Sequence, residues 1–164
     1  MLLIFGGLPG VGKTAIAVGL SREIKAVHLR IDSIEQAMRN SNITVSGPEG
    51  YEVAYAVAED NLELGRTVMA DSVNPIAVTR AAWRDIAKRA GSRYVEIEIV
   101  CSDQAEHRRR VEERVADIVG HVLPTWQEVC EREYEPWEAD IVIDAAGKGV
   151  DACVAELRAK LEGA

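Results

Sequence analysis

Short apolar runs alternate with longer segments of mixed polarity along the whole chain. The first run, residues 2–5, is wholly apolar and is followed by a pair of glycines, which predicts a buried strand. Apolar side chains then recur every fourth residue after Lys13 and predict a helix. The same patterns predict further strands at residues 26–31, 67–70, 94–101 and 141–143, and further helices at about 33–39, 51–64, 75–90, 102–116, 126–134 and 150–161.

Strands that alternate with helices in this way favour a mostly parallel sheet with helices on both of its faces. A chain of 164 residues fits one domain of this kind. Only one Phe, three Trp and four Tyr are present, so the core must consist mainly of Val, Ile, Leu and Ala, as in buried parallel strands. We therefore expect one α/β domain over residues 1–164.

The net charge of −8 argues against binding to nucleic-acid backbone, because that binding needs a surplus of Lys and Arg. It still allows a small phosphorylated ligand in a locally positive pocket. Cys101, Cys130 and Cys153 are widely spaced and odd in number, which argues against a disulfide framework or a zinc site and favours a reducing cytoplasm. No apolar run approaches the roughly 18 residues of a membrane span, so we expect a soluble cytoplasmic protein.

One segment matches the phosphate-loop pattern G-x-x-x-x-G-K-[ST] at every position. It follows the first predicted strand and opens the first predicted helix, which is the context that the pattern requires. Its glycines let successive backbone N–H groups point at phosphate oxygens, and the helix start adds a positive dipole end. Lys13 is expected to reach the β- and γ-phosphates, and the Thr14 hydroxyl to coordinate Mg²⁺. The predicted nucleotide contacts in this loop are Gly7, Leu8, Pro9, Gly10, Val11, Gly12, Lys13 and Thr14.

Several classes of phosphate-loop protein are excluded by what the rest of the sequence lacks. There is no Asn-Lys-x-Asp guanine motif of GTPases and no LSGGQ signature of transporter ATPases. The D-x-x-G string at Asp117 follows a charged helix instead of a strand and is discounted. AAA-type machines carry a second, helical domain, for which 164 residues leave no room. Small kinases, whose acceptor site and lid fit in one domain, remain.

Charged residues end two of the predicted strands, where ligands bind in doubly wound sheets. Arg30 and Asp32 share one side of the second strand. Asp32 is a candidate base for an acceptor hydroxyl, and Arg30 is a candidate contact for an anionic part of the acceptor. A capping box, Asp32-x-x-Glu35, is the alternative interpretation of Asp32. Asp71 ends the third strand and is the candidate that orients Mg²⁺ through water, although the sequence leaves open which aspartate takes the proton.

Five further residues are candidates for ligand contact. Ser72 and Asn74 follow the third strand and are expected near the acceptor, although Asn74 before a proline also fits a helix N-cap. Arg80 contacts either the substrate or solvent. His121 is a candidate substrate contact, and Lys148 is a candidate nucleotide contact past the fifth strand. The other two histidines, at positions 28 and 107, are interpreted as structural or solvated.

Residues 106–114 hold four arginines in an otherwise acidic chain. Their i,i+4 spacing to glutamates fits a solvated helix with ion pairs. Arg110 and Arg114, however, share a helix face, where like charges repel unless an anion lies between them. An irregular stretch, residues 117–125, follows at once. We interpret residues 108–125 as a lid that closes over phosphates and excludes water, with Arg110 and Arg114 as its phosphate-contacting, catalytic residues.

The phosphate loop, Asp32, Asp71 and the arginine-rich segment together resemble the small P-loop kinases. That group includes gluconate kinase, shikimate kinase, chloramphenicol phosphotransferase and the kinase module of polynucleotide kinase. The resemblance covers nearly the whole chain. It implies a three-layer fold with a five-stranded parallel sheet of order 2-3-1-4-5, ATP as donor, Mg²⁺, Asp32 as general base, and lid arginines that stabilise the transferring phosphoryl group.

Two segments carry more particular resemblances. The segment Arg114…Gly120-His121…Pro124…Glu135-Pro136 is similar to the lid and following helix of gluconate-kinase-like enzymes. The string Asp71-Ser72-Val73-Asn74, with Arg80 beyond it, resembles the third-strand motif of the polynucleotide-kinase-like branch. These acceptor motifs match no one member closely enough to identify the substrate.

The sequence therefore predicts an ATP-dependent kinase that transfers the γ-phosphoryl group to a hydroxyl of a small-molecule acceptor. Lys13, Mg²⁺ and lid arginines would stabilise charge while Asp32 activates the hydroxyl. A polynucleotide 5′-hydroxyl kinase is an alternative, but the net charge of −8 counts against the basic channel that its acceptor needs. The other alternative is a regulator that binds ATP and hydrolyses it slowly, which leaves Arg30 and Asp32 unexplained. The acceptor and the oligomeric state stay open.

Overall fold

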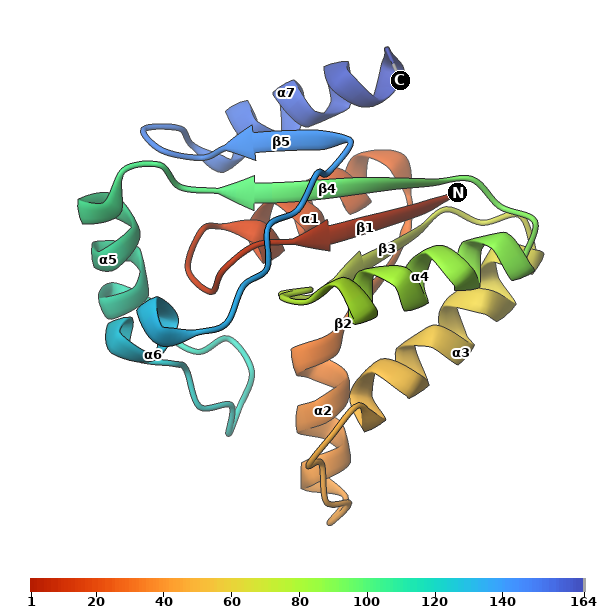
Figure 1. The fold of residues 1–164 in the computed structure, drawn as a ribbon, viewed down its shortest axis with the longest axis horizontal. Helices are drawn as coiled ribbons and strands as arrows, with labels where there is room; N and C mark the ends of the chain where they lie inside the picture. Colours follow the sequence, from red (N-terminus) through yellow and green to blue (C-terminus); the bar gives the residue numbers. More distant parts are fainter. Residues whose placement is uncertain (164) are drawn as a thin grey trace.

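The computed structural model describes residues 1–163 and contains a five-stranded sheet flanked by helices (Figure 1). The strands are β1 (Leu2–Gly6), β2 (Val27–Arg30), β3 (Val68–Asp71), β4 (Tyr94–Val100) and β5 (Ile141–Asp144). The helices are α1 (Lys13–Ile24), α2 (Ile31–Asn40), α3 (Glu49–Glu63), α4 (Ala77–Arg89), α5 (Gln104–Glu113), α6 (Trp126–Glu131) and α7 (Val150–Glu162). Every strand pairing is parallel and the strand order is β2-β3-β1-β4-β5, which confirms the α/β fold and the 2-3-1-4-5 order expected from the sequence.

Alternate side chains of β1 are buried in two separate cores, one on each face of the sheet. Leu3 and Phe5 belong to the core that α1 and α7 cover, together with Leu157. Leu2 and Ile4 belong to the opposite core, which α3 and α4 cover. All four β1 side chains are fully buried, as expected for the middle strand of a parallel sheet. Because all five strands run parallel, their carboxyl ends lie at one edge of the sheet. The loop from β1 to α1 lies at the same edge (Figure 1).

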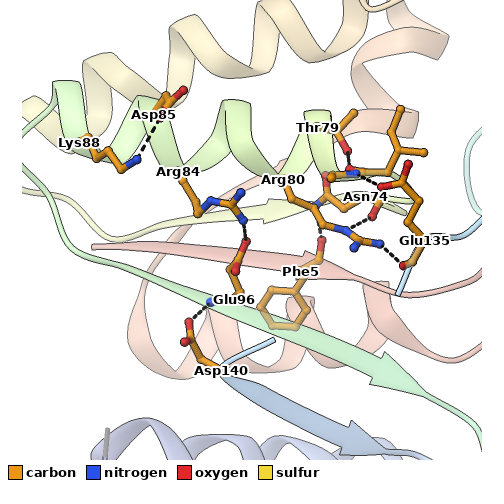
Figure 2. Close-up of polar contacts among 12 residues, drawn as sticks. Phe5, Asn74, Thr79, Arg80, Arg84, Asp85, Lys88, Glu96, Glu135 and Asp140 are labelled. Atoms are coloured by element: carbon orange, nitrogen blue, oxygen red, sulfur yellow. Dashed lines mark hydrogen bonds and ion pairs between the residues drawn. The ribbon is translucent and has the colours of Figure 1, made fainter. Parts of the chain in front are cut away.

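The loop between β3 and α4 differs from the sequence prediction. Helix α4 begins at Ala77 and its N-cap is Ile76, so the predicted N-cap at Asn74 is wrong. Asn74 is fully buried in the left-handed region, with a φ of +47°, and its Nδ2 donates to the Phe5 carbonyl at 2.6 Å (Figure 2). The amide therefore ties this loop to the end of β1. It does not line the cavity described below, which corrects the expected acceptor contact.

Arg80 on α4 is buried inside the protein, with only 2% of its surface exposed (Figure 2). Its guanidinium donates to the carbonyls of Asn74, Pro75, Glu135 and Pro136 at 2.8–3.1 Å. The centroids of two aromatic rings lie 4.7 and 5.3 Å from its Cζ. The side chain thus joins α4 to the segment that leads into β5. This placement corrects the expected contact with substrate or solvent, because the donors of the guanidinium are used inside the fold.

We expect Arg80→Ala to lower the free energy of unfolding by about 3 kcal/mol, because it leaves buried carbonyls without donors. Urea denaturation followed by circular dichroism measures this loss. Arg80→Lys keeps the charge but not the planar set of donors, and it should recover less than half of the stability. Arg89→Ala on the same helix removes an exposed arginine and should change stability little. Equal effects of Arg80→Ala and Arg89→Ala would contradict the structural role.

Several element boundaries differ from the predicted ones by a few residues. Helix α2 begins at Ile31, directly after β2, instead of at residue 33. Helix α5 ends at Glu113, before the predicted end near residue 116, and α6 ends at Glu131 instead of 134. No helix within residues 1–163 is long and apolar enough to cross a membrane.

Candidate active site

The phosphate loop, residues 7–14, connects β1 to α1 in a conformation that its glycines allow. Gly10 and Gly12 have φ angles of +88° and +100°, in the left-handed region, and Gly12 is the N-cap of α1. His107 on α5 is buried and donates from Nε2 to the Pro9 carbonyl at 2.8 Å, so it is structural. The first N–H groups of α1 have no partner inside the helix and are available to an anion.

A large cavity extends from the phosphate loop to α2. Its volume is about 1350 Å³, more than the roughly 300–1000 Å³ of a pocket for one small molecule. Residues 9–14 and Asp32 on α2 both line it. Residues of the loop between α5 and α6, which we call the α5–α6 loop (residues 114–125), line it as well. The cavity is therefore large enough for a nucleotide and a second small molecule.

Three charged or titratable side chains meet where β2, β3 and α1 come together. Asp71 is 2% exposed, with Lys13 Nζ 3.6 Å from its Oδ1 and His28 Nε2 3.1 Å from its Oδ2. Burial alone would raise the pKa of Asp71, but the Lys13 charge and the His28 hydrogen bond outweigh it and lower the pKa. The carboxylate is therefore held ionised behind the phosphate loop.

The side chains beside the phosphate loop fit a magnesium ion that is bound together with phosphates. Asp71 Oδ1 is buried without a hydrogen-bond partner, so this anionic oxygen has free acceptor capacity. Thr14 lines the cavity, whereas Asp71 does not, which suits contact through water. No three His, Cys, Asp or Glu side chains of residues 1–163 cluster as a complete metal site. Mg²⁺ usually keeps several waters and takes most of its other oxygens from the substrate phosphates, so this small donor set is what such a site needs.

His28 is a site residue that the sequence analysis interpreted only as structural or solvated. Its side chain contacts Asp71 because β2 pairs in parallel with β3, with Arg30 opposite Asp71 and His28 opposite Met69. The period of two along β2 puts His28 on the same side as Arg30. That alternation was visible in the sequence, but the neighbouring strand and its register were not.

Asp32 lines the cavity from the first turn of a helix and not from a strand end. Strand β2 stops at Arg30, so Asp32 belongs to the first turn of α2. The N-cap of α2 is Arg30 and no side chain caps it, so the alternative capping box with Glu35 does not form. The Asp32 carboxylate is 46% exposed; Arg30 Nε is 3.9 Å from it and His121 Nε2 is 4.0 Å from it. Asp32 thus presents a largely uncommitted carboxylate to the cavity.

Arg30 is bound to the α5–α6 loop. Its Nη1 and Nη2 donate to the two carboxylate oxygens of Asp117 at 2.5 and 3.0 Å. The hydrogen bond from Arg30 is the main cause that lowers the pKa of Asp117. The anion that Arg30 holds in this structure is therefore supplied by the chain itself.

The two arginines predicted for the lid have different surroundings. Arg110 donates to Glu106 at 2.6 Å and to the carbonyls of Val11 and Ala145 at 3.2 and 2.8 Å. Arg114 follows the end of α5 in an extended conformation, so the predicted common helix face with Arg110 does not exist. Its Nε is buried without a hydrogen-bond partner, and burial lowers its pKa. Arg110 is thus fixed beside the phosphate loop, whereas Arg114 has unused donor capacity.

Arg132, just after α6, is a cavity residue that the sequence analysis missed. Among residues 1–163, Arg114 and Arg132 are the cavity-lining arginines without a carboxylate within 4.0 Å. Arg132 lies outside the run of arginines at 108–114, so no local cluster of charge marks it in the sequence. Its position in the cavity depends on how the α5–α6 loop folds back, which no local pattern indicates.

The remaining predicted contacts, Ser72, His121 and Lys148, all line the cavity. Ser72 is buried, lines the cavity and has an Oγ without a hydrogen-bond partner. His121 lines it from the α5–α6 loop. Lys148 lines it near the phosphate loop, with its Nζ 2.7 Å from Glu156. The structure therefore brings together all predicted acceptor residues except Asn74 and Arg80.

Comparisons with known proteins place this geometry in context. Residues 2–132 match the model of a family described as an AAA domain. No curated protein matches the sequence. The structure is similar to APS kinase from Mycobacterium tuberculosis (19% identity, TM-score 0.67, 98% of this chain and 96% of that one) and to a gluconokinase from Sinorhizobium meliloti (15%, 0.67, 98% and 91%). It is also similar to Kti12 from Chaetomium thermophilum in complex with ADP-AlF3 (19%, 0.71, 100% and 98%).

At these identities the structural likeness shows the fold alone, which is that of small P-loop kinase-like proteins. The family match concerns residues 2–132, which here form β1 to β4 and α1 to α6 around one sheet. AAA-type machines were excluded in the sequence analysis because these carry a second, helical domain in addition to the nucleotide-binding one. The matched family is described by the AAA domain alone. The matched segment contains the phosphate loop, Asp32, Asp71 and the α5–α6 loop.

Proposed function

Because this chain belongs to the AAA-domain family, with its phosphate loop inside the matched segment, we propose that it is an ATP-dependent kinase that acts on a hydroxyl of a small molecule. The observation that carries this proposal is that Lys13 and Asp32 line the same cavity of about 1350 Å³. A phosphate-binding end and a free carboxylate in one cavity hold a nucleotide and an acceptor close enough to react. The names of two structural neighbours, APS kinase and gluconokinase, support the proposal.

In this proposal ATP lies with its phosphates along residues 7–14 and its base toward Arg110 and Lys148, which also line the cavity. Lys13 places its ammonium against the β- and γ-phosphates. Thr14, and Asp71 through water, hold Mg²⁺, which when bound neutralises part of the phosphate charge. Asp71 is kept ionised for this role by Lys13 and His28.

Asp32 is the proposed general base. The hydroxyl oxygen of the acceptor bonds to the γ-phosphorus while the bond between that phosphorus and the β–γ bridging oxygen breaks. The hydroxyl proton goes to the Asp32 carboxylate, and ADP leaves with the electron pair of the broken bond. Ser72 and His121 line the cavity and position the acceptor.

The proposed lid, residues 108–125, excludes water from the reaction. Within residues 1–163 Arg114 and Arg132 have no carboxylate partner, so we assign them to the charge of the transferring phosphoryl group. Arg110, held by three hydrogen bonds, is assigned to the nucleotide. The proposed compartment is the cytoplasm, in line with three free cysteines.

ATP consumption by the purified protein with Mg²⁺ tests the proposal directly. The acceptor panel contains sugar acids, nucleosides, aminoglycoside and phenicol antibiotics, and a short 5′-hydroxyl oligonucleotide. One small acceptor that raises turnover far above the rate with water, with phosphate found on its hydroxyl, would support the kinase. Selective phosphorylation of the oligonucleotide would point to the polynucleotide kinase instead. Tight ATP binding with slow hydrolysis and no active acceptor would favour the regulator.

We expect His28→Leu to weaken Mg²⁺-ADP binding by about tenfold, because outer-shell partners of metal-site carboxylates typically contribute this much. Calorimetric titration of ADP with and without Mg²⁺ measures the effect. Binding of ADP in a chelator should change much less, because the phosphate loop itself is intact. His28→Gln keeps an N–H donor and should restore most of the affinity. Equal losses with and without Mg²⁺ would contradict the role of His28 in orienting Asp71.

A further inference from the structure

We propose that the acceptor is a small hydroxy acid whose carboxylate binds the Arg30 guanidinium in place of the Asp117 side chain. This inference rests on the proposed kinase function and names the class of acceptor at the same site. Its basis is the contact between Arg30 and Asp117, together with the charges around it.

The Arg30–Asp117 contact has the geometry of a carboxylate-binding site. Two guanidinium nitrogens each donate to one carboxylate oxygen, at 2.5 and 3.0 Å. Such paired donors match the planar, two-oxygen shape of a carboxylate, which a single point charge does not. A carboxylate therefore fits this place in the cavity, whichever molecule carries it.

The two partners are unequally buried. The Arg30 side chain is 16% exposed and lies at the end of β2, whereas the Asp117 side chain is 65% exposed and belongs to the α5–α6 loop. Both residues line the cavity. The Arg30 guanidinium is thus a fixed part of the cavity wall, whereas the Asp117 carboxylate is supplied by an exposed loop. A ligand carboxylate that accepts the same two hydrogen bonds from Arg30 offsets the loss of the Asp117 contact, so the exchange needs little net free energy.

The charges near Arg30 favour a ligand with one negative charge in this position. With Asp117 displaced, the Arg30 guanidinium lacks the one negative charge that Asp117 supplies in this structure. A ligand carboxylate restores that charge. A phosphate dianion leaves an excess negative charge beside Asp32, which is unfavourable.

The proposed base lies close enough for one small molecule to reach both groups. Arg30 Nε is 3.9 Å from Asp32 Oδ2. With a hydrogen bond at each end, the hydroxyl and the carboxylate of the acceptor must lie within on the order of 9 Å of each other. Hydroxy acids of a few carbon atoms meet this condition. Acceptor binding then also removes the bond that holds the α5–α6 loop to β2.

Anion binding to the Asp117→Ala variant tests the site without ATP or turnover. The probes are acetate, its neutral counterpart acetamide, and inorganic phosphate at pH 8, and the readout is the ¹⁵N NMR signal of the Arg30 Nε–H. We expect acetate to bind Asp117→Ala at least tenfold more tightly than the wild-type chain, in which Asp117 competes. Acetamide and phosphate should both bind at least tenfold more weakly than acetate. The double variant Arg30→Ala, Asp117→Ala, titrated by backbone amide signals, should show no acetate site.

Each contrary outcome of the titration has a definite meaning. Tighter binding of phosphate than of acetate would overturn the carboxylate class in favour of a phosphorylated acceptor. Acetate binding that is the same in all three proteins would show that Arg30 forms no anion site, and the proposal would fall.

Turnover with hydroxy acids and with their neutral amides separates this inference from the proposed function. We expect acids to be phosphorylated with at least tenfold higher kcat/KM than the matching amides. Phosphorylation of neutral acceptors at equal or higher rates would overturn the acceptor class while supporting the kinase. No phosphorylation of any acceptor would overturn the kinase itself, even if the acetate titration succeeded.

Discussion

Replacing Lys13 with alanine is expected to lower the kcat/KM of phosphotransfer by about 10³-fold or more, since positioned cations on a transferring phosphoryl group have effects of this size. Lys13 is 8% exposed, lines the cavity at the start of α1 and has its Nζ 3.6 Å from Asp71. The substitution removes the cation that meets the phosphates. It also leaves the buried Asp71 carboxylate unopposed on that side, so the remaining charge repels the nucleotide.

A steady-state assay with the identified acceptor, together with calorimetric titration of ATP, measures both parts of the Lys13 effect. Loss of the ion pair with Asp71 also threatens the fold, because a buried carboxylate without its partner is costly. The double variant Lys13→Ala, Asp71→Asn removes that cost and should recover thermal stability but not activity. Lys88→Ala on α4, an exposed lysine, is the matched control. An active, ATP-binding Lys13→Ala protein would refute the assignment of the phosphate loop.

The parts of the site that the sequence predicts well are those that depend on neighbouring residues. The phosphate loop needs glycines at positions with positive φ, a strand before it and a helix after it, and all of these are local properties. The order of the strands is less local. It was implied by the resemblance to small P-loop kinases, and the parallel pairing of β1 with β3 and β4 confirms it.

The errors arise where a local rule competes with distant partners. Asn74 before a proline has the sequence of an N-cap, but its amide reaches the Phe5 carbonyl instead. Arg80 looks like a surface arginine of an amphipathic helix, yet backbone carbonyls far along the chain accept its hydrogen bonds. Which backbone carbonyls are buried and need a donor depends on the tertiary fold, and no sequence pattern indicates it. Such positions can therefore be found only once the fold is known.

The prediction for the arginine-rich helix failed for a different reason. The common face of Arg110 and Arg114 assumed that the helix continues, whereas Arg114 takes a ψ of 144° and leaves it. Arg110 is paired with Glu106 four residues before it, whereas the residue four before Arg114 is Arg110 itself. The end of the helix thus separates the two arginines without removing an ion pair from either. In place of the predicted pair of equal cations, the structure has one fixed and one uncommitted cation.

Asp32→Asn is expected to lower kcat by about 10³-fold while the affinity for ATP stays within about twofold, because a general base contributes roughly 10²–10⁴-fold. The substitution keeps the shape of the side chain. Asp32 is 46% exposed, and the basic side-chain atoms nearest to it, Arg30 Nε and His121 Nε2, are 3.9 and 4.0 Å away, so little of the fold depends on its charge. Circular dichroism and thermal unfolding should match those of the wild-type protein. Asp60→Asn on α3, outside the cavity, is the control.

Asp71→Asn should behave differently, and the contrast decides which aspartate takes the proton. Asp71 is 2% exposed, does not line the cavity and has Lys13 and His28 beside its carboxylate, so we expect an acceptor in the cavity to meet Asp32 and not Asp71. Its substitution should weaken Mg²⁺-nucleotide binding and lower the rate together. Asp32→Asn should lower the rate alone. Unchanged turnover of Asp32→Asn would exclude it as the base. A joint loss of ATP affinity and rate in Asp32→Asn would instead place its carboxylate with the nucleotide, as part of the metal site that we assign to Thr14 and Asp71.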